Sequence, residues 1–144
     1  MKFIWILVVL FNITDCKNNE DAITQQPEWI LEYKATSRGT YQNIKIDKKI
    51  IEVTNVRSGN PKSSSIEKKD WDNLQNILKS INIEELPQLK PPSQDHQFDG
   101  AALAELIITK DNKTYETQTF DHGNPPATIS KLVKEMLSLA EKIE

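Results

Sequence analysis

The sequence predicts an α+β fold: an antiparallel sheet, made of a three- or four-strand meander plus a C-terminal hairpin, with two helices covering one face. Apolar and polar residues alternate over residues 29–56, which is the period of half-buried strands. Residues 68–82 and 125–143 instead repeat apolar residues every three or four positions, as amphipathic helices do. Strand-like runs between these two segments indicate a hairpin. This order of elements favours helices packed on one side of an antiparallel sheet.

The first half of the chain predicts the meander. Trp29, Leu31 and Tyr33 alternate with charged residues, and Ile44 and Ile46 share one face of the next run. Turn-forming residues separate the runs, with glycine or aspartate in each connection. The expected strands are residues 29–35, 40–47, 50–56 and, as a short fourth strand, 62–66.

A first helix is expected at residues 68–82, where Trp71, Leu74, Leu78 and Ile81 form an apolar stripe. Residues 83–86 could add one helical turn. Three prolines follow at 87, 91 and 92, and they predict an extended, non-helical chain as far as residue 97 because proline removes a backbone donor and restricts the residue before it.

The hairpin is expected from residues 102–110 and 113–120, joined by Asp111 and Asn112. These two residue types tolerate the positive φ angles that a two-residue turn requires. The resulting register pairs Lys110 with Lys113, Leu103 with Phe120 and Ala101 with His122. It therefore brings residues 98–100 and 120–123 to the same end of the hairpin.

The second helix is expected to follow the hairpin, with Asn124 as its N-cap and Pro125 as its first helical residue. Its apolar stripe predicts a face that packs on the sheet. That stripe consists of Ile129, Leu132, Val133, Met136, Leu137, Ala140 and Ile143.

The composition indicates one domain and argues against a nucleic-acid partner. A chain of 144 residues with 38% hydrophobic and 27% charged residues is ordinary for a globular protein. The net charge is −3, and the longest basic clusters are pairs of lysines among acidic residues. Binding to nucleic acid calls for a concentrated basic patch instead.

The amino terminus resembles a signal peptide, which we assign to residues 1–15. Residues 3–11 are an unbroken apolar run after Lys2, too short for the roughly 20 residues of a membrane-spanning helix but suited to a secretory leader. A buried strand is the competing interpretation, but the run shows no alternation.

Cys16, the only cysteine, follows this leader directly. Residues 13–16 (ITDC) resemble a bacterial lipobox, with an aliphatic residue three places before Cys16; they differ from that pattern at Asp15, where a small residue is usual. We therefore expect lipidation of Cys16, a flexible lipid-anchored tether over residues 16–28 and a folded domain over 29–144. A lone cysteine permits no internal disulfide.

Asp95, His96, Asp99, Asp121 and His122 form the one constellation with ligand chemistry, because zinc accepts imidazole and carboxylate. One hypothesis is a metal or acid-base hydrolytic site built from Asp99, Asp121 and His122. The alternative, which we favour, is that the aspartates accept backbone hydrogen bonds in turns, and that Asp121 or His122 caps the second helix. We expect no metal ligand set and no cofactor.

Catalytic motifs are absent from the sequence. There is no Gly-x-Ser-x-Gly nucleophile motif and no glycine-rich phosphate loop, and the four glycines stand singly. Because Cys16 is assigned to the lipid anchor, it is not a candidate nucleophile. We expect a protein that is not an enzyme.

Four stretches carry a resemblance to a known group of proteins: residues 34–41 (KATSRGTY), 69–74 (KDWDNL), 98–101 (FDGA) and 120–126 (FDHGNPP). From residue 29 to the carboxyl terminus, the chain resembles small uncharacterised lipoproteins of Bacteroidetes bacteria. The resemblance implies a location in the cell envelope, at the outer membrane, with a lipid such as palmitate on Cys16 and the domain facing the periplasm or the cell surface. It implies no activity, so no catalytic residue is carried over from it. Because the sequence has no catalytic motif, we expect a binding or structural module with an envelope protein or a glycan as partner.

Overall fold

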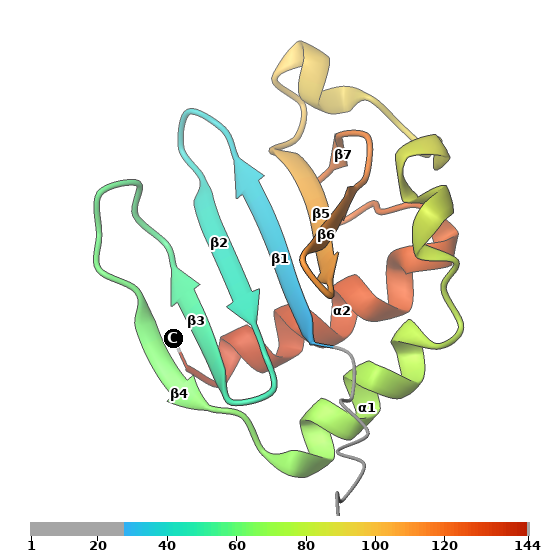
Figure 1. Cartoon of the computed structure of the whole chain (residues 1–144). Coiled ribbons are helices and arrows are strands. Elements are labelled where there is room, and N and C mark those ends of the chain that lie inside the picture. The colour runs from blue at the N-terminus through green and yellow to red at the C-terminus, as the bar shows by residue number, and fades with distance from the viewer. Residues whose placement is uncertain (1–27, 144) are drawn as a thin grey trace, which may run out of the picture.

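The computed structural model describes residues 28–143, and within them it confirms the α+β fold (Figure 1). The strands are β1 (Trp29–Thr36), β2 (Tyr41–Ile46), β3 (Ile50–Thr54), β4 (Lys62–Ser65), β5 (Leu103–Lys110), β6 (Lys113–Glu116) and β7 (Phe120–Asp121). The helices are α1 (Lys68–Leu78) and α2 (Ala127–Glu141), with short 3₁₀ helices η1 (Ile83–Gln88) and η2 (Asp95–Phe98). The expected leader, Cys16 and nearly all of the tether lie outside the described residues.

The seven described strands form one antiparallel sheet in the order β4-β3-β2-β1-β5-β6, with β7 also paired to β5. The four-strand meander β1 to β4 is confirmed, and the hairpin adds to it through β5, which pairs with β1. Both α-helices lie on one face of the sheet (Figure 1). No helix within residues 28–143 has the length and apolar character needed to cross a membrane.

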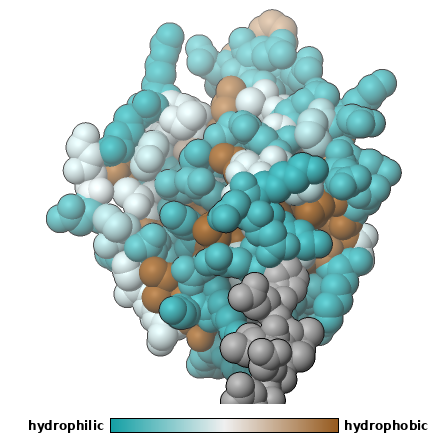
Figure 2. Space-filling model, in the orientation of Figure 1, coloured by the Kyte–Doolittle hydropathy of each residue, from teal (hydrophilic) through white to brown (hydrophobic). Residues whose placement is uncertain are grey.

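The core lies between the helices and alternate residues of the central strands. Leu31, Tyr33 and Ala35 of β1 are buried, as the sequence pattern predicts, and the stripes of α1 and α2 pack against the same side. The opposite face of the sheet is largely hydrophilic (Figure 2). There Nζ of Lys34 lies 3.5 Å from Glu32 of the same strand and 3.6 Å from Glu105 of β5, so one ion pair along β1 and one across to β5 cover this face.

The turns at the two ends of the meander are fixed by side chains close in sequence. The hydroxyl of Ser37 accepts the backbone N–H groups of Gly39 and Thr40 at 3.3 and 3.1 Å. At the other end, Oδ1 of Asp47 accepts those of Lys49 and Ile50 at 2.6 and 2.9 Å. Such bonds offer the backbone an alternative to strand pairing, which is why the strands end there.

The helix boundaries differ from the prediction in two places. Helix α1 ends at Leu78 because the N–H groups of Ser80 and Ile81 donate to acceptors three residues back. The side chain of Asn82 then accepts the N–H of Glu84 to start η1. Helix α2 begins at Ala127, with Pro126 in the cap position and no side-chain cap. The assignments of Asn124 as the cap and Pro125 as the first helical residue were therefore wrong.

The hairpin turn is confirmed, but the register changes along the hairpin. Asp111 and Asn112 have φ angles of 49° and 65°, and Lys110 pairs with Lys113 as expected. Further on, Phe120 pairs with Ala104 and not with Leu103. One extra residue therefore lies between the two paired segments, which is a bulge.

The cause of the bulge is Thr117. Its N–H donates to the carbonyl of Leu106 at 3.0 Å, while its side-chain Oγ1 accepts the N–H of Leu106 at 3.1 Å in place of a backbone carbonyl. A one-residue slip reverses the faces of a strand. Phe120 is consequently turned into the core, where it is fully buried.

Candidate functional site

Two regions at opposite ends of the sheet carry the candidate functional residues. We call the end that holds Glu28 and the turns 47–49 and 111–112 the proximal end. The end that holds the turn 37–40, the loop 93–102 and the segment 122–126 is the distal end (Figure 1).

At the distal end, the carboxylate of Asp121 is 3% exposed and accepts four hydrogen bonds. The hydroxyl of Ser93 donates at 2.5 Å, and the backbone N–H groups of Asp95 and His96 donate at 2.9 and 2.8 Å. The ring nitrogen Nδ1 of His96 lies 2.6 Å away. Asp121 therefore caps the 3₁₀ helix η2, which explains why a stretch predicted to be extended is helical.

The electrostatic setting keeps Asp121 ionised. Burial by itself would raise its pKa, but the hydrogen bonds from Ser93, from the two backbone N–H groups and from His96 outweigh burial and bring the pKa well below its usual value. An ionised carboxylate only accepts hydrogen bonds, so Nδ1 of His96 carries the proton of this contact.

A carboxylate that orients an imidazole in this way also occurs in catalytic triads, where the imidazole in turn contacts a nucleophile. Here the hydroxyl of Ser93 donates to the carboxylate of Asp121 and accepts a hydrogen bond from Nδ2 of Asn124 at 2.7 Å, so it does not contact the imidazole as a nucleophile would. The arrangement therefore does not reproduce a triad. Its hydrogen bonds hold the loop 93–98 to strand β7.

His122, the other histidine, belongs to a different contact. The hydroxyl of Tyr33 lies 2.7 Å from Nδ1 of His122, and the two rings are tilted with centroids 6.0 Å apart. Burial raises the pKa of Tyr33 well above its usual value, so the tyrosine stays protonated and donates to Nδ1. His122 thus contacts the buried residue Tyr33 at the edge of the core.

The structure does not bring Asp99, Asp121 and His122 together as ligands. Asp99 ends η2 in the left-handed region with φ 58°, while Asp121 contacts His96 and His122 contacts Tyr33. Within residues 28–143 no three His, Cys, Asp or Glu side chains are placed to hold a metal ion. The expectation that Asp121 or His122 caps α2 was also wrong, because Asp121 caps η2 and α2 has no side-chain cap.

Ser93, Asn124 and Tyr33 were not identified from the sequence as partners of this cluster. Each contacts a residue that is 28 to 89 positions away, and no local motif marks such a pair. The one usable signal was the burial expected for a tyrosine in the central strand, because a buried Tyr hydroxyl needs a partner.

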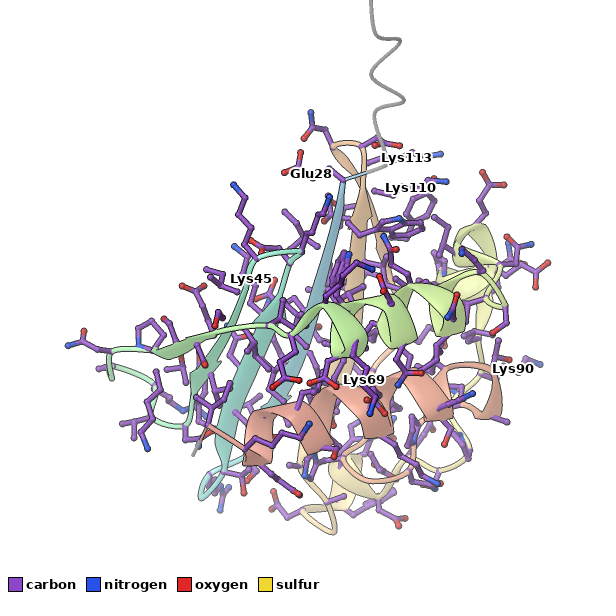
Figure 3. All side chains as sticks on the ribbon, turned by 90° about the horizontal axis from the view of Figure 1, so that it is seen from below. Glu28, Lys45, Lys69, Lys90, Lys110 and Lys113 are labelled. Atoms are coloured by element: carbon purple, nitrogen blue, oxygen red, sulfur yellow. The ribbon has the colours of Figure 1, made fainter. Side chains whose placement is uncertain are left out.

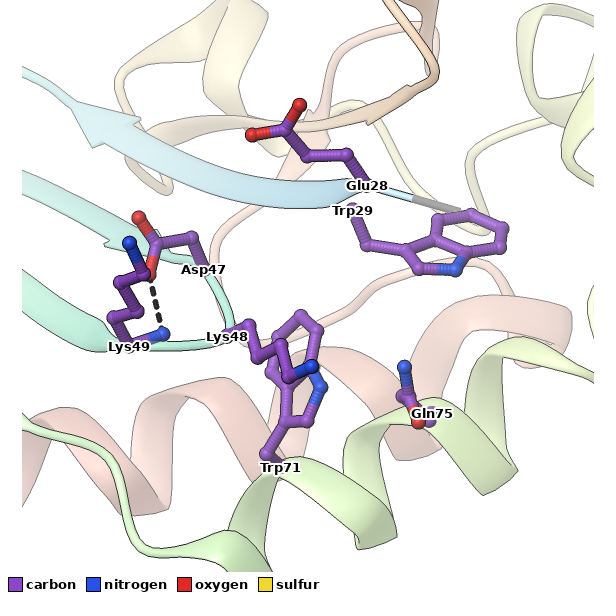
Figure 4. Close-up of a pocket in the computed structure, with 7 residues that line it drawn as sticks. All are labelled: Glu28, Trp29, Asp47, Lys48, Lys49, Trp71 and Gln75. Carbon is purple, nitrogen blue, oxygen red and sulfur yellow. Dashed lines mark hydrogen bonds between the residues drawn. The ribbon is translucent and has the colours of Figure 1, made fainter. Parts of the chain in front are cut away.

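A pocket of about 220 Å³ lies at the proximal end, between the start of β1, the β2–β3 turn and α1 (Figure 4). We call it the tryptophan pocket. It is lined by Glu28, Trp29, Asp47, Lys48, Lys49, Trp71 and Gln75. Trp71 is 4% exposed, and its indole Nε1 is buried without a hydrogen-bond partner among the described residues.

Nearby contacts position the pocket walls. The N–H of Glu28 donates to Oδ1 of Asp111 at 3.1 Å, which ties the start of β1 to the hairpin turn. Lys110 places its ammonium 5.1 Å from the ring centre of Trp29. Figure 3 shows Lys110 and Lys113 beside Glu28 at this end of the molecule. Trp29 and Trp71 were predicted as core residues, but no sequence pattern indicated that they line one pocket.

Comparison with known proteins adds no family assignment. No protein-family model matches the chain, and no curated protein is significantly similar to it.

Proposed function

We propose that this protein is a lipoprotein of the cell envelope, anchored at the outer membrane through Cys16, and that its domain is a non-catalytic binding or structural module. The observation that carries this proposal is the short apolar run of residues 3–11 ending just before the only cysteine of the chain. A leader of that length followed by a cysteine is typical of exported proteins that are lipidated.

The position of Glu28 supports this arrangement. The described domain begins at the proximal end, and a lipid on Cys16 would be separated from Glu28 by only eleven residues. A flexible chain of that length has a typical end-to-end distance of about 20 Å. The proximal end would then face the membrane, and the distal end would face the periplasm or the cell surface.

The distal end has features suited to contact with an envelope protein or a glycan. Phe98, the last residue of η2, is 83% exposed, and the hydrogen bonds to Asp121 fix the helix that carries it. An aromatic side chain held on a fixed loop can bind a partner without first paying the entropy of ordering that loop.

Fractionation and mass spectrometry of the expressed full-length protein test the anchor. We expect protein in the membrane fraction whose first residue is Cys16 carrying covalent lipid. The Cys16→Ala variant should keep the same circular dichroism spectrum but leave the membrane fraction. An intact Met1, or an unmodified Cys16 in soluble protein, would contradict the proposal.

A further inference from the structure

We propose that the tryptophan pocket binds a small carboxylate whose body is a six-membered ring, with the carboxylate held by Lys48 and the indole N–H of Trp71. This inference goes beyond the proposed contact at the distal end, because it assigns a ligand class to a separate site at the proximal end. It does not depend on the lipid anchor.

The polar groups that line the pocket include the donors of Lys48 and Trp71 and the amide of Gln75, with the carboxylates of Glu28 and Asp47 at the rim. Figure 4 shows the side chain of Lys48 extending across the indole of Trp71, with the amide of Gln75 on the other side. Lys48 forms no ion pair with any residue from 28 to 143. The ammonium of Lys48 is exposed, and the buried indole N–H of Trp71 has no acceptor among residues 28–143. A ligand that supplies acceptor oxygens would satisfy the indole N–H and pair with the ammonium.

The carboxylates of Asp47 and Glu28 at the rim of the pocket do not change the preference for a ligand with acceptor oxygens. Oδ1 of Asp47 already accepts the N–H groups of Lys49 and Ile50. The carboxylate of Glu28 points away from Trp71, as does the ammonium of Lys49 (Figure 4). An anion is therefore favoured over a cation at the centre of the pocket.

The size and walls of the pocket indicate the body of the ligand. A protein cavity of about 150 Å³ lined by apolar side chains holds benzene. The tryptophan pocket measures about 220 Å³, which leaves room for a six-membered ring and an attached carboxylate. Because Trp29 and Trp71 supply the apolar walls, a rigid ring suits the space better than a flexible chain.

Aromatic acids and sugar acids both have this chemistry, and binding measurements on the full-length protein separate them. We would titrate phenylacetate and glucuronate by calorimetry, with 2-phenylethanol and glucose as neutral analogues. We expect saturable binding of at least one carboxylate, with its neutral analogue about tenfold weaker or more, as expected for loss of one charge-assisted hydrogen bond.

Two neighbouring lysines provide a matched comparison. Lys48→Gln should raise Kd about tenfold, whereas Lys49→Gln, one residue away in the same turn, should change Kd less than about twofold. Trp71→Phe keeps an aromatic ring but removes the N–H, and it should also weaken binding. Circular dichroism of each variant checks that the domain is folded.

Three results would overturn the pocket assignment. They are no binding of either carboxylate up to about 10 mM, equal binding of acids and neutral analogues, or equal losses for Lys48→Gln and Lys49→Gln. The Cys16→Ala protein should bind as tightly as the wild type. Loss of the anchor with binding retained contradicts only the lipoprotein proposal, and an anchored protein without binding contradicts only the pocket.

Discussion

The two ends of the domain use aspartate in different ways. At the proximal end, Asp47 accepts the backbone N–H groups of residues two and three positions later. At the distal end, Asp121 accepts those of Asp95 and His96, which precede it by 26 and 25 positions. The side chain and the type of bond are the same, yet one builds a turn within its own neighbourhood and the other joins two distant segments.

This difference shows where the structure depends on local sequence and where it depends on the assembled sheet. The turn at Asp47 needs only a few residues of chain, so it forms wherever the two flanking strands pair. The capping of η2 requires β7 to be in place first, and β7 takes its position only after the bulge at Thr117. Substitutions at the distal end should therefore leave the proximal end intact, whereas the distal end depends on the assembled sheet.

The largest effect is expected for Phe120→Ala. The bulge turns Phe120 fully into the core, so removing its ring should lower the free energy of unfolding by about 3–5 kcal/mol. Urea denaturation measures the change. Thr119→Ala, at an exposed neighbouring position, is the control and should stay within about 0.5 kcal/mol of the wild type. Similar losses for both variants would mean that Phe120 does not face the core.

A smaller effect is expected for Asn112→Ala at the proximal end. Asn112 has a φ angle of 65°, a conformation that costs alanine roughly 1 kcal/mol. Asn112→Gly should instead be close to neutral, because glycine adopts this conformation without steric strain. Thermal unfolding of the three proteins tests this order. If alanine and glycine gave the same stability, the positive φ would not matter to the turn.

The smallest effect is expected for the pH dependence of the stabilisation that Asp121 provides. Its pKa is lower in the folded protein than in the unfolded chain, so the stabilisation is complete above the unfolded pKa of about 4. It is lost as the pH falls through the lowered pKa. In a His96→Gln background, the stability lost on Asp121→Asn should be constant above about pH 5 and shrink below about pH 4. A loss that grew on acidification would contradict the lowered pKa.

Much of the fold could be predicted because its signals are local. Alternation placed β1 to β3, the three- and four-residue spacing placed both α-helices, and Asp111 and Asn112 placed the hairpin turn. The bulge could not be predicted, since it depends on Oγ1 of Thr117 reaching the N–H of Leu106 across the hairpin. A threonine in a strand-like run is otherwise typical of an ordinary strand residue.

The candidate sites could be predicted less well from the sequence than the fold. Asp121 and His96 both stood out as titratable residues, but their pairing required the register beyond the bulge. The tryptophan pocket joins Trp29, Lys48 and Trp71 from three separate elements. Each of these residues alone looks like core or solvated surface, and only the assembled topology brings them together.

Hydrogen exchange of individual backbone amides tests the contrast between the two ends most directly. In the Asp121→Asn variant, the amides of Asp95 and His96 should exchange at least about tenfold faster than in the wild type. The amides of Lys49 and Ile50, which donate to Asp47, should exchange at unchanged rates. Faster exchange at both ends, or unchanged protection of Asp95 and His96, would contradict the account.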